Sequence, residues 1–497
     1  TMDAPEGPRR FSFTASPLIT PLDVNKSAQY GTIADVSELE AILGENEESL
    51  STTASHEAKL LLKYSVPLTI TYLLQYSFSL VTIFVVGHLG TEELGAVSLA
   101  TMTANITGYA IYEGLATSLD TLCAQAYGSG RKEQVGLHLQ RMILLMLLVT
   151  LPIGLLWTFS GPILAALVPE TKLAHMAGNY LQVLLFSCPG YAIFEAGKRF
   201  VQAQGLFNAS LLVLLISTPL NMLFNYLFVF TWHLHLRGAA LATVLSNTLL
   251  PILLLLIISF IYPSSLECWT GVSRSALRNW TPMLALSLPG IIMVEAEWLA
   301  FDILTFSTSF LSTAHLAAQS VVMTTCVVMF HVPFSVSVAV STRLGNLIGA
   351  GALHAARTAT RTYVLIFAVM GVVDAIVIAA LRDVLPSAFS TDADVVRIAS
   401  GTMPVLAVFQ ICDASTALVN AVLRGLGAQK IGGCVNLGVY YGIAVPLALW
   451  LCFGAPAMEL RGLWVGCVVG SGLISLVEGG WAWGCRWEEA VERARVR

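Results

Sequence analysis

The stretch that decides the fold is residues 282–306, PMLALSLPGIIMVEAEWLAFDILTF, a mostly apolar run that contains three acidic residues. A transmembrane helix needs about 20 predominantly apolar residues. Because backbone groups in hydrocarbon must be hydrogen-bonded within their own segment, such a run is expected to be helical. Further runs of this kind occur near residues 64–86, 95–119, 136–159, 174–194, 208–230, 239–262, 313–338, 359–380, 398–421, 431–453 and 462–484. The sequence therefore predicts an all-α integral membrane protein with twelve transmembrane helices.

The composition of the whole chain agrees with a membrane protein. Of its 497 residues, 56% are hydrophobic and 11% are charged, whereas a soluble domain carries about 25% charged residues. This balance excludes a soluble enzyme, a nucleic-acid-binding protein and a disordered protein. The net charge of −5 comes from the residues up to His56, where nine acidic residues face three basic ones. We expect residues 1–58 to form a disordered, acidic, cytosolic tail.

An internal repeat divides the chain into two similar halves. The sequence SVPL at Ser65 matches SLPG at Ser287 with an offset of 222 residues, and GSG at Gly128 matches GAG at Gly349 with an offset of 221. Each half holds six spans, so the halves share one orientation, as in carriers whose two lobes rock around a central site. The expected parts are an N-lobe at 59–262, a cytosolic linker at 263–281, a C-lobe at 282–484 and a cytosolic tail at 485–497.

Basic residues indicate how the chain is inserted. Because twelve spans are an even number, both termini lie on one side of the membrane. The loops expected on that side carry eleven basic residues: Arg131, Lys132, Lys198, Arg199, Arg274, Arg278, Arg343, Arg357, Arg361, Arg424 and Lys430. The opposite loops carry five: Lys172, Arg237, Arg382, Arg397 and Arg461. Cytosolic loops are enriched in Lys and Arg, so both termini are expected in the cytosol. The membrane is expected to be the plasma membrane or the vacuolar membrane.

Acidic residues inside the spans are candidates for function, because a charge at the bilayer centre costs at least about 2.5–3.5 kcal/mol. They are Glu113, Glu295, Glu297, Asp302, Asp374, Asp413 and Glu478. On a helix Glu295 and Glu297 point about 200° apart, and Glu297 and Asp302 about 140° apart, so at most two of these three are expected to face one cavity. We assign function to Glu297. Packing or helix-end contacts are expected for Glu295, Asp374, Glu478 and Asp120.

The chemistry of a buried carboxyl group suits a proton-coupled carrier of cations. An unpaired carboxyl group in an apolar site has a raised pKa, so it exchanges a proton near neutral pH and pairs with a cation only after the proton has left. Asp413 is the expected second member of the proton site, with Asp302 in reserve. In the repeat, the N-lobe position equivalent to Glu297 is Gln75, which cannot bind a proton in the same way. Protons are therefore expected to bind mainly in the C-lobe. Substrate binding is expected at Glu297, Trp298, Gln75 and Asn105, although Asn105 could equally bridge two helices.

Several segments resemble the multidrug and toxic compound extrusion (MATE) family in its eukaryotic branch. The resemblance covers roughly residues 60–485. The segments that carry it are VGHLG at 86–90, NITG at 105–108, LDTLCAQAYG at 119–128, EW at 297–298, RLGNLIGAG at 343–351 and LRGLGAQ at 423–429. The resemblance implies twelve helices in two six-helix lobes, and export of organic cations or other toxic compounds against an inward proton gradient.

The same resemblance implies roles for individual residues. The acid before Trp in the seventh span, here Glu297, is expected to be essential for coupling, and Asp413 matches the family's acid in the tenth span. Asp302 stands where a Glu is commoner. Glu295 stands where a small residue or Cys is expected, and Thr324 stands where some animal members have a further Glu, so the full acidic set of those members is not present.

Alternative functions are weighed against this one. A sodium-coupled exporter would need several oxygen ligands around the ion. A lipid or oligosaccharide flippase would need basic residues in its cavity, and the expected spans hold almost none apart from Arg141. An enzyme would need a cluster of His, Cys or Ser residues, and the sequence shows no such cluster. A metal site would need a CxxC pair or another ligand spacing, which is also not found. We expect a monomer in the lipid bilayer that needs no cofactor, carries small organic cations or xenobiotics and uses protons as the coupling ion.

Overall fold

The computed structural model describes residues 52–168 and 170–497, and every regular element in these ranges is a helix. Ten helical segments are long and apolar enough to cross a membrane. They are α3 (Ala54–Gly87), α6 (Lys132–Thr158), α10 with a π-helical end (Phe207–Thr231), α11 (His235–Phe260), α12 (Thr281–Thr308), α13 (Thr313–Gly349), α14 (Leu353–Ala380), α16 (Ala393–Leu426), α17 with α18 (Gln429–Phe453) and α19 (Glu459–Gly484).

Two further runs of helix are interrupted by a change of helix type. In the first, α4 (Thr91–Ala104) and α5 (Ala110–Gly128) are joined by a π-helical turn, Asn105–Tyr109. In the second, α8 (Thr171–Leu184) and α9 (Cys188–Ala203) are joined by a 3₁₀ turn. With these two, the described residues form twelve long helical runs, and each expected span lies within one of them to within two residues. Three short helices are α7 (Ser160–Leu167), α15 (Val384–Phe389) and α20 (Trp487–Val496).

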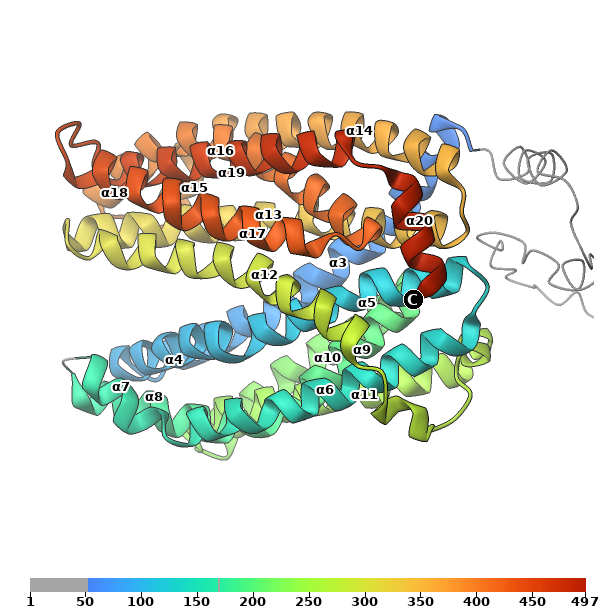
Figure 1. Ribbon diagram of the computed structural model, residues 1–497. Helices are drawn as coiled ribbons and strands as arrows, with labels where there is room; N and C mark the ends of the chain where they lie inside the picture. Colours follow the sequence, from blue (N-terminus) through green and yellow to red (C-terminus); the bar gives the residue numbers. More distant parts are fainter. Residues whose placement is uncertain (1–51, 169) are drawn as a thin grey trace, which may run out of the picture. The chain divides into compact units, whose positions relative to one another are not determined.

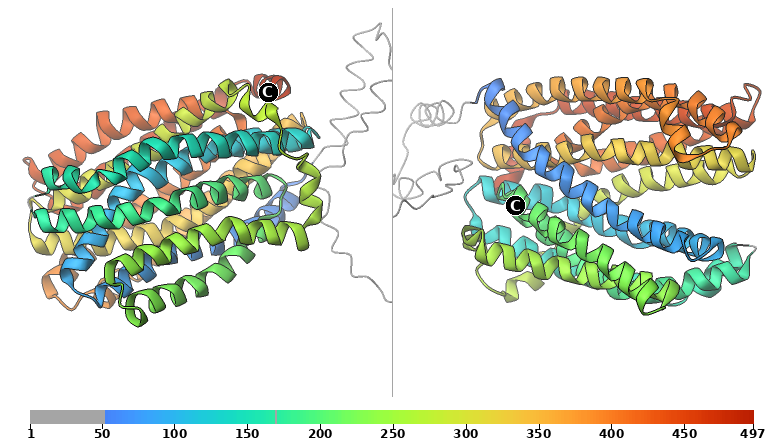
Figure 2. Two further views of the ribbon diagram at one scale, coloured as in Figure 1. Left: turned by 90° about the horizontal axis from the view of Figure 1, so that it is seen from below. Right: turned by 180° about the vertical axis from the view of Figure 1, so that it is seen from behind.

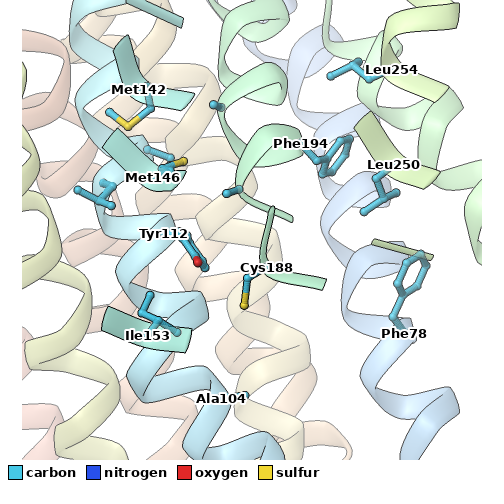
Figure 3. Close-up of a cluster of buried hydrophobic side chains, with 14 of the residues drawn as sticks. Phe78, Ala104, Tyr112, Met142, Met146, Ile153, Cys188, Phe194, Leu250 and Leu254 are labelled. Carbon is cyan, nitrogen blue, oxygen red and sulfur yellow. The ribbon is translucent and has the colours of Figure 1, made fainter. Parts of the chain in front are cut away.

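The helices form two lobes, each with its own apolar core. One core gathers residues between Phe78 and Leu286, among them Tyr112, Met146 and Phe194 (Figure 3). The other is built around Phe301, Phe409 and Trp464, whose ring centroids lie 5.5–6.0 Å apart. Figure 1 and the right view of Figure 2 show most of the blue-to-green helices in one lobe and most of the yellow-to-red helices in the other. The expected two-lobed, all-helical membrane fold is therefore confirmed.

Two equivalent helices of the repeat cross from one lobe to the other. Helix α12 begins against α5 of the N-lobe and ends among the helices of the C-lobe. Helix α3 begins against α13 and α14 of the C-lobe and continues along α10 and α4 of the N-lobe. The same pattern in both halves follows from the sequence repeat, and Pro67 and Pro289 lie inside these two helices without interrupting them.

The ends of the chain differ from the tails that we expected. Residues 54–58 belong to α3, and Glu57 is fully buried, where it accepts hydrogen bonds from Arg343 Nη2 (2.6 Å) and the Tyr363 hydroxyl (2.7 Å). The rest of that expected tail, residues 1–51, lies outside the described residues. At the other end, α20 packs on both lobes: Arg131 Nη2 donates to the Ala494 carbonyl (2.6 Å) and Arg497 Nη2 to the Gly427 carbonyl (3.3 Å).

The lobes meet most closely at the end of the molecule that carries α20. Gly128 ends α5 and lies against the backbone of Asn346, while its repeat partner Gly349 ends α13 and lies against the backbone of Gln125. A Cβ atom at either glycine would overlap these backbone atoms. The GSG and GAG segments are therefore the matching halves of one contact between the lobes, which only glycine permits.

Gly128→Ala and Gly349→Ala are each expected to lower the free energy of unfolding by about 1–3 kcal/mol, because the added methyl group overpacks this contact. Gly480 is the matched control, since it lies inside α19 and has no atom within 4 Å of an added Cβ. Gly480→Ala is expected to have the opposite sign, with a gain of up to about 1 kcal/mol from helix propensity. Thermal unfolding of the three purified variants checks this, and equal shifts for all three would contradict the contact.

Candidate functional site

A cavity of about 580 Å³ lies between the two lobes. Its N-lobe wall comes from α3, α4, α5, α8, α9 and α11, and its C-lobe wall from α12, α13 and α16. The volume is within the range of about 300–1,000 Å³ that small-molecule sites occupy. The lining is mostly apolar and aromatic, with a small number of charged side chains from both lobes. This combination is typical of a binding site for small organic molecules.

All six residues that the sequence analysis assigned to the site line this cavity. Glu297, Trp298 and Asp302 come from α12, Asp413 from α16, Gln75 from α3, and Asn105 from the π-helical turn between α4 and α5. The structure brings these residues together from distant parts of the chain. Their roles in proton and substrate binding stay predictions.

The C-lobe carboxyl groups differ in their surroundings. Asp413 is 2% exposed, and its Oδ2 has no hydrogen-bond partner among the described residues. Glu297 and Asp302 are half-buried, on the part of α12 that faces the cavity. Glu295, two residues before Glu297, is outside the cavity lining, as the helical angle between them requires. Two of the three acids in this span thus face the cavity.

Other acids that we expected to pack also lie outside the lining. Asp374 on α14 and Glu478 on α19 are buried, and neither belongs to the cavity wall. Two buried asparagines also lie outside the lining. The Asn221 side chain donates to Ser246 Oγ (2.9 Å), and the Asn225 side chain donates to the Asn221 backbone carbonyl (3.0 Å).

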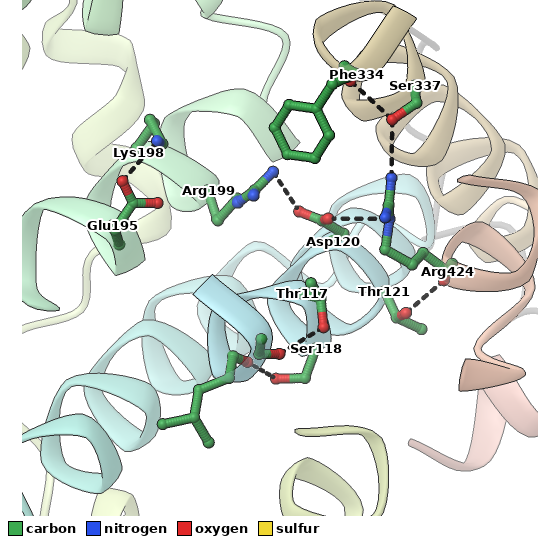
Figure 4. A network of polar contacts seen from close by, with 12 residues as sticks. Thr117, Ser118, Asp120, Thr121, Glu195, Lys198, Arg199, Phe334, Ser337 and Arg424 are labelled. Atoms are coloured by element: carbon green, nitrogen blue, oxygen red, sulfur yellow. Dashed lines mark hydrogen bonds and ion pairs between the residues drawn. The ribbon is translucent and has the colours of Figure 1, made fainter. Parts of the chain in front are cut away.

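The N-lobe wall carries charged residues that the sequence analysis missed. Lys198 Nζ lies 2.7 Å from Glu195 Oε1, and Gln75 Nε2 donates to the same oxygen at 2.9 Å. Figure 4 shows the contact between Glu195 and Lys198. Both residues line the cavity, and each is 1% exposed. They were missed because residues 195–203 are too polar to be read as a span, whereas α9 continues to Ala203. The i,i+3 spacing of Glu195 and Lys198 is the signal that could have indicated a paired, buried helix.

Asp120 corrects another expectation. We expected a helix-end or loop contact, but Asp120 lies inside α5 and is 4% exposed. Its Oδ1 is 3.2 Å from Arg199 Nη1 of the same lobe, and its Oδ2 is 3.6 Å from Arg424 Nε of the C-lobe (Figure 4). Arg424 Nη2 also donates to Ser337 Oγ (3.0 Å). This group of residues, Asp120, Arg199 and Arg424, ties the lobes together at the base of the cavity.

Buried basic residues reduce the number of Lys and Arg residues that can be counted in the cytosolic loops. Four of the eleven residues counted as loop cations are buried within helices: Lys198, Arg199, Arg343 and Arg424. Seven therefore remain against five on the other side. The expected spans hold almost no basic residue apart from Arg141, but the helices extend beyond those spans, and Lys198 and Arg424 line the cavity. Buried cations are tolerated where a buried acid pairs with them.

Comparison with known proteins agrees with the internal repeat. A family model described as MatE matches this chain twice, over residues 67–227 and residues 289–450. The two matches begin 222 residues apart, which is the offset of the internal repeat. The chain belongs to the MATE transporter family. In this MATE transporter the first match lies in the N-lobe half of the chain and the second in the C-lobe half.

Relatives of this MATE transporter come from several kingdoms. An uncharacterized transporter of Schizosaccharomyces pombe is 39% identical over 470 residues, which are 94% of this chain and 87% of that protein. Protein DETOXIFICATION 16 of Arabidopsis thaliana is 33% identical and covers 90% of this chain and 92% of its own. Multidrug and toxin extrusion protein 1 of Homo sapiens is 30% identical, with 88% and 77% covered.

Solved structures place this chain in the eukaryotic branch. The crystal structure of the eukaryotic MATE transporter AtDTX14 superimposes with a TM-score of 0.85 at 30% sequence identity, and it covers 89% of this chain and 99% of that one. A MATE transporter of Vibrio cholerae, VcmN, gives a TM-score of 0.75 at 20% identity, which supports the fold alone.

Proposed function

We propose that this MATE transporter is a proton-coupled antiporter that exports organic cations or xenobiotics. The observation that carries the proposal is the charge of the cavity. Five carboxyl side chains line it, against two Lys or Arg side chains. The acids are Glu113, Glu195, Glu297, Asp302 and Asp413, and the bases are Lys198 and Arg424. Such a lining attracts cations when its carboxyl groups are ionised.

Glu297 and Asp413 are the groups that exchange protons for cargo. A carboxylate without a partner in a poorly hydrated site is costly, so it is occupied by either a proton or a cation. Cargo binds to the deprotonated pair from the cytosol, and protons from the far side displace it after the lobes have rocked. Trp298, beside Glu297 on the same wall, offers an aromatic face to an organic cation.

The proposed orientation places both termini in the cytosol. After the buried cations are set aside, the loops still favour that side by seven to five, and Arg486, Arg493 and Arg495 of the C-terminal segment add to it. The contact formed by Gly128, Gly349 and the Asp120 group then lies on the cytosolic side of the cavity. In this orientation the contact between the lobes closes the cytosolic end of the cavity.

Two other functions are alternatives, and the first of them is less consistent with the cavity. A flippase needs free cations to hold phosphate groups, but Lys198 is paired with Glu195 and Arg424 with Asp120. Sodium coupling needs several oxygen ligands around one point, and the vesicle measurement described next separates it from proton coupling.

Purified protein in lipid vesicles tests the coupling ion. We expect a pH gradient alone to drive efflux of tetraethylammonium, and a sodium gradient at equal pH to have no effect. The control is the same measurement in vesicles without protein. Efflux that follows the sodium gradient and ignores the pH gradient would contradict proton coupling.

A further inference from the structure

The N-lobe wall of the cavity contains two tyrosine–glutamate pairs with the same spacing. Tyr109 and Glu113 lie four residues apart on the run formed by the π-helical turn and α5, and Tyr191 and Glu195 lie four residues apart on α9. Residues at this spacing share one face of a helix. All four side chains line the cavity, and the Tyr109 and Tyr191 ring centroids are 4.6 Å apart. Two helices thus bring a pair of aromatic rings and a pair of carboxyl groups to one patch.

This patch has polar atoms that nothing in the described chain satisfies. Glu195 accepts from Gln75 and Lys198 through Oε1 alone, and its buried Oε2 has no partner among the described residues. The hydroxyl group of Tyr72, a residue that is 5% exposed, also has no partner in the described ranges, although it lines the same wall. An unmet buried acceptor costs about 1–3 kcal/mol, so these atoms indicate that a ligand group completes the site.

Glu113 is the ionisable group of this patch that is available to a ligand. It lines the cavity and forms neither an ion pair nor a hydrogen bond with any residue that the structure describes. The π-helical turn Asn105–Tyr109 ends four residues before Glu113, and this type of distortion often occurs at functional sites. Lys198 Nζ already lies 4.6 Å from the centre of the Tyr72 ring, so an aromatic ring of this wall accepts an ammonium group.

We propose that Glu113, Tyr109 and Tyr191 form a second cation subsite, and that the preferred cargo carries two positive centres. One centre lies at Glu297 and Asp413 on the C-lobe wall, and the other lies at the tyrosine–glutamate patch on the N-lobe wall of the same cavity. Aromatic faces bind quaternary ammonium groups, and the carboxylate supplies the opposite charge. The inference rests on the proposed export of cations and names its substrate class as organic dications.

The test compares a cation with one quaternary ammonium group, tetraethylammonium, with hexamethonium, which has two. Export of each is measured in vesicles that contain the full-length protein. We expect Glu113→Gln to raise the concentration of hexamethonium needed for half-maximal export about tenfold, because the second ammonium group loses its contact with the carboxylate. The corresponding concentration of tetraethylammonium is expected to change by less than about threefold. Glu295→Gln is the matched control, because it removes a carboxyl group outside the cavity lining.

A second pair of variants, at Tyr109, keeps the proposal testable if the Glu113→Gln protein does not fold. Tyr109→Phe retains the ring and is expected to behave like the parent, whereas Tyr109→Leu is expected to weaken hexamethonium export selectively. If Glu113→Gln and Tyr109→Leu affect both compounds equally, or neither, the second subsite is wrong while cation export stands. If the parent protein exports neither compound, the proposed function fails and the subsite fails with it.

Discussion

Glu297→Gln is expected to reduce proton-driven cation efflux to the level of vesicles without protein. The substitution keeps the size of the side chain and its ability to form hydrogen bonds, but glutamine can neither release a proton nor carry a negative charge. Because Glu297 lines the cavity on α12 with Asp413 on the facing helix α16, its loss removes both cargo binding and coupling. The measurement is initial efflux of tetraethylammonium under an imposed pH gradient.

The control for this result is Glu295→Gln, two residues away on the same helix. Glu295 is the same residue type in the same span but lies outside the cavity lining. We expect this variant to retain most of the parent's efflux. Equal efflux from Glu297→Gln and the parent would show that the proposed mechanism is wrong, and equal loss in both variants would show that the acids act through stability rather than through the cavity.

Asp120→Asn is expected to destabilise the protein by about 3–5 kcal/mol, because it leaves the Arg199 and Arg424 guanidinium groups buried without their shared counter-charge. Both arginines are at least nine-tenths buried, and Arg424 belongs to the opposite lobe. The loss therefore also weakens the contact that holds the lobes closed at the base of the cavity. Thermal unfolding of purified protein in detergent provides the measurement.

An exposed ion pair is the control for Asp120. Asp394 and Arg397 are 3.0 Å apart, with side chains 70% and 75% exposed. Exposed pairs contribute about 0–1 kcal/mol, so Asp394→Asn is expected to change the unfolding temperature little. If Asp120→Asn unfolds like Asp394→Asn, the group formed by Asp120, Arg199 and Arg424 does not stabilise this conformation.

Local patterns in the sequence were sufficient to predict much of the fold. Hydropathy located the spans because lipid requires long apolar helices, and it does so without knowledge of any partner. The matches between Ser65 and Ser287 and between Gly128 and Gly349 revealed the repeat, since equivalent helices meet equivalent surroundings. The angle between Glu295 and Glu297 correctly indicated that they face different surroundings, because helix geometry is local.

The residues that sequence reasoning missed depend on partners far away in the chain. Arg424 is buried because Asp120 faces it from a helix 304 residues earlier in the chain. Arg343 is buried because it pairs with Glu57, which lies 286 residues earlier. Glu195 and Lys198 neutralise each other within one helix, but their burial requires the neighbouring helices of the lobe. Hydropathy assigns such charged residues to loops, since it gives no credit for pairing.

Proton movement recorded during cation efflux is the most direct test of the central claim, that the cavity carboxyl groups exchange protons for organic cations. Vesicles that contain the transporter, a pH-sensitive dye and tetraethylammonium are diluted into cation-free medium without sodium. We expect the interior to become more acidic as the cation leaves, at a constant ratio of protons to cations, and we expect neither change with Glu297→Gln. Cation efflux without any acidification of the interior would contradict the central claim.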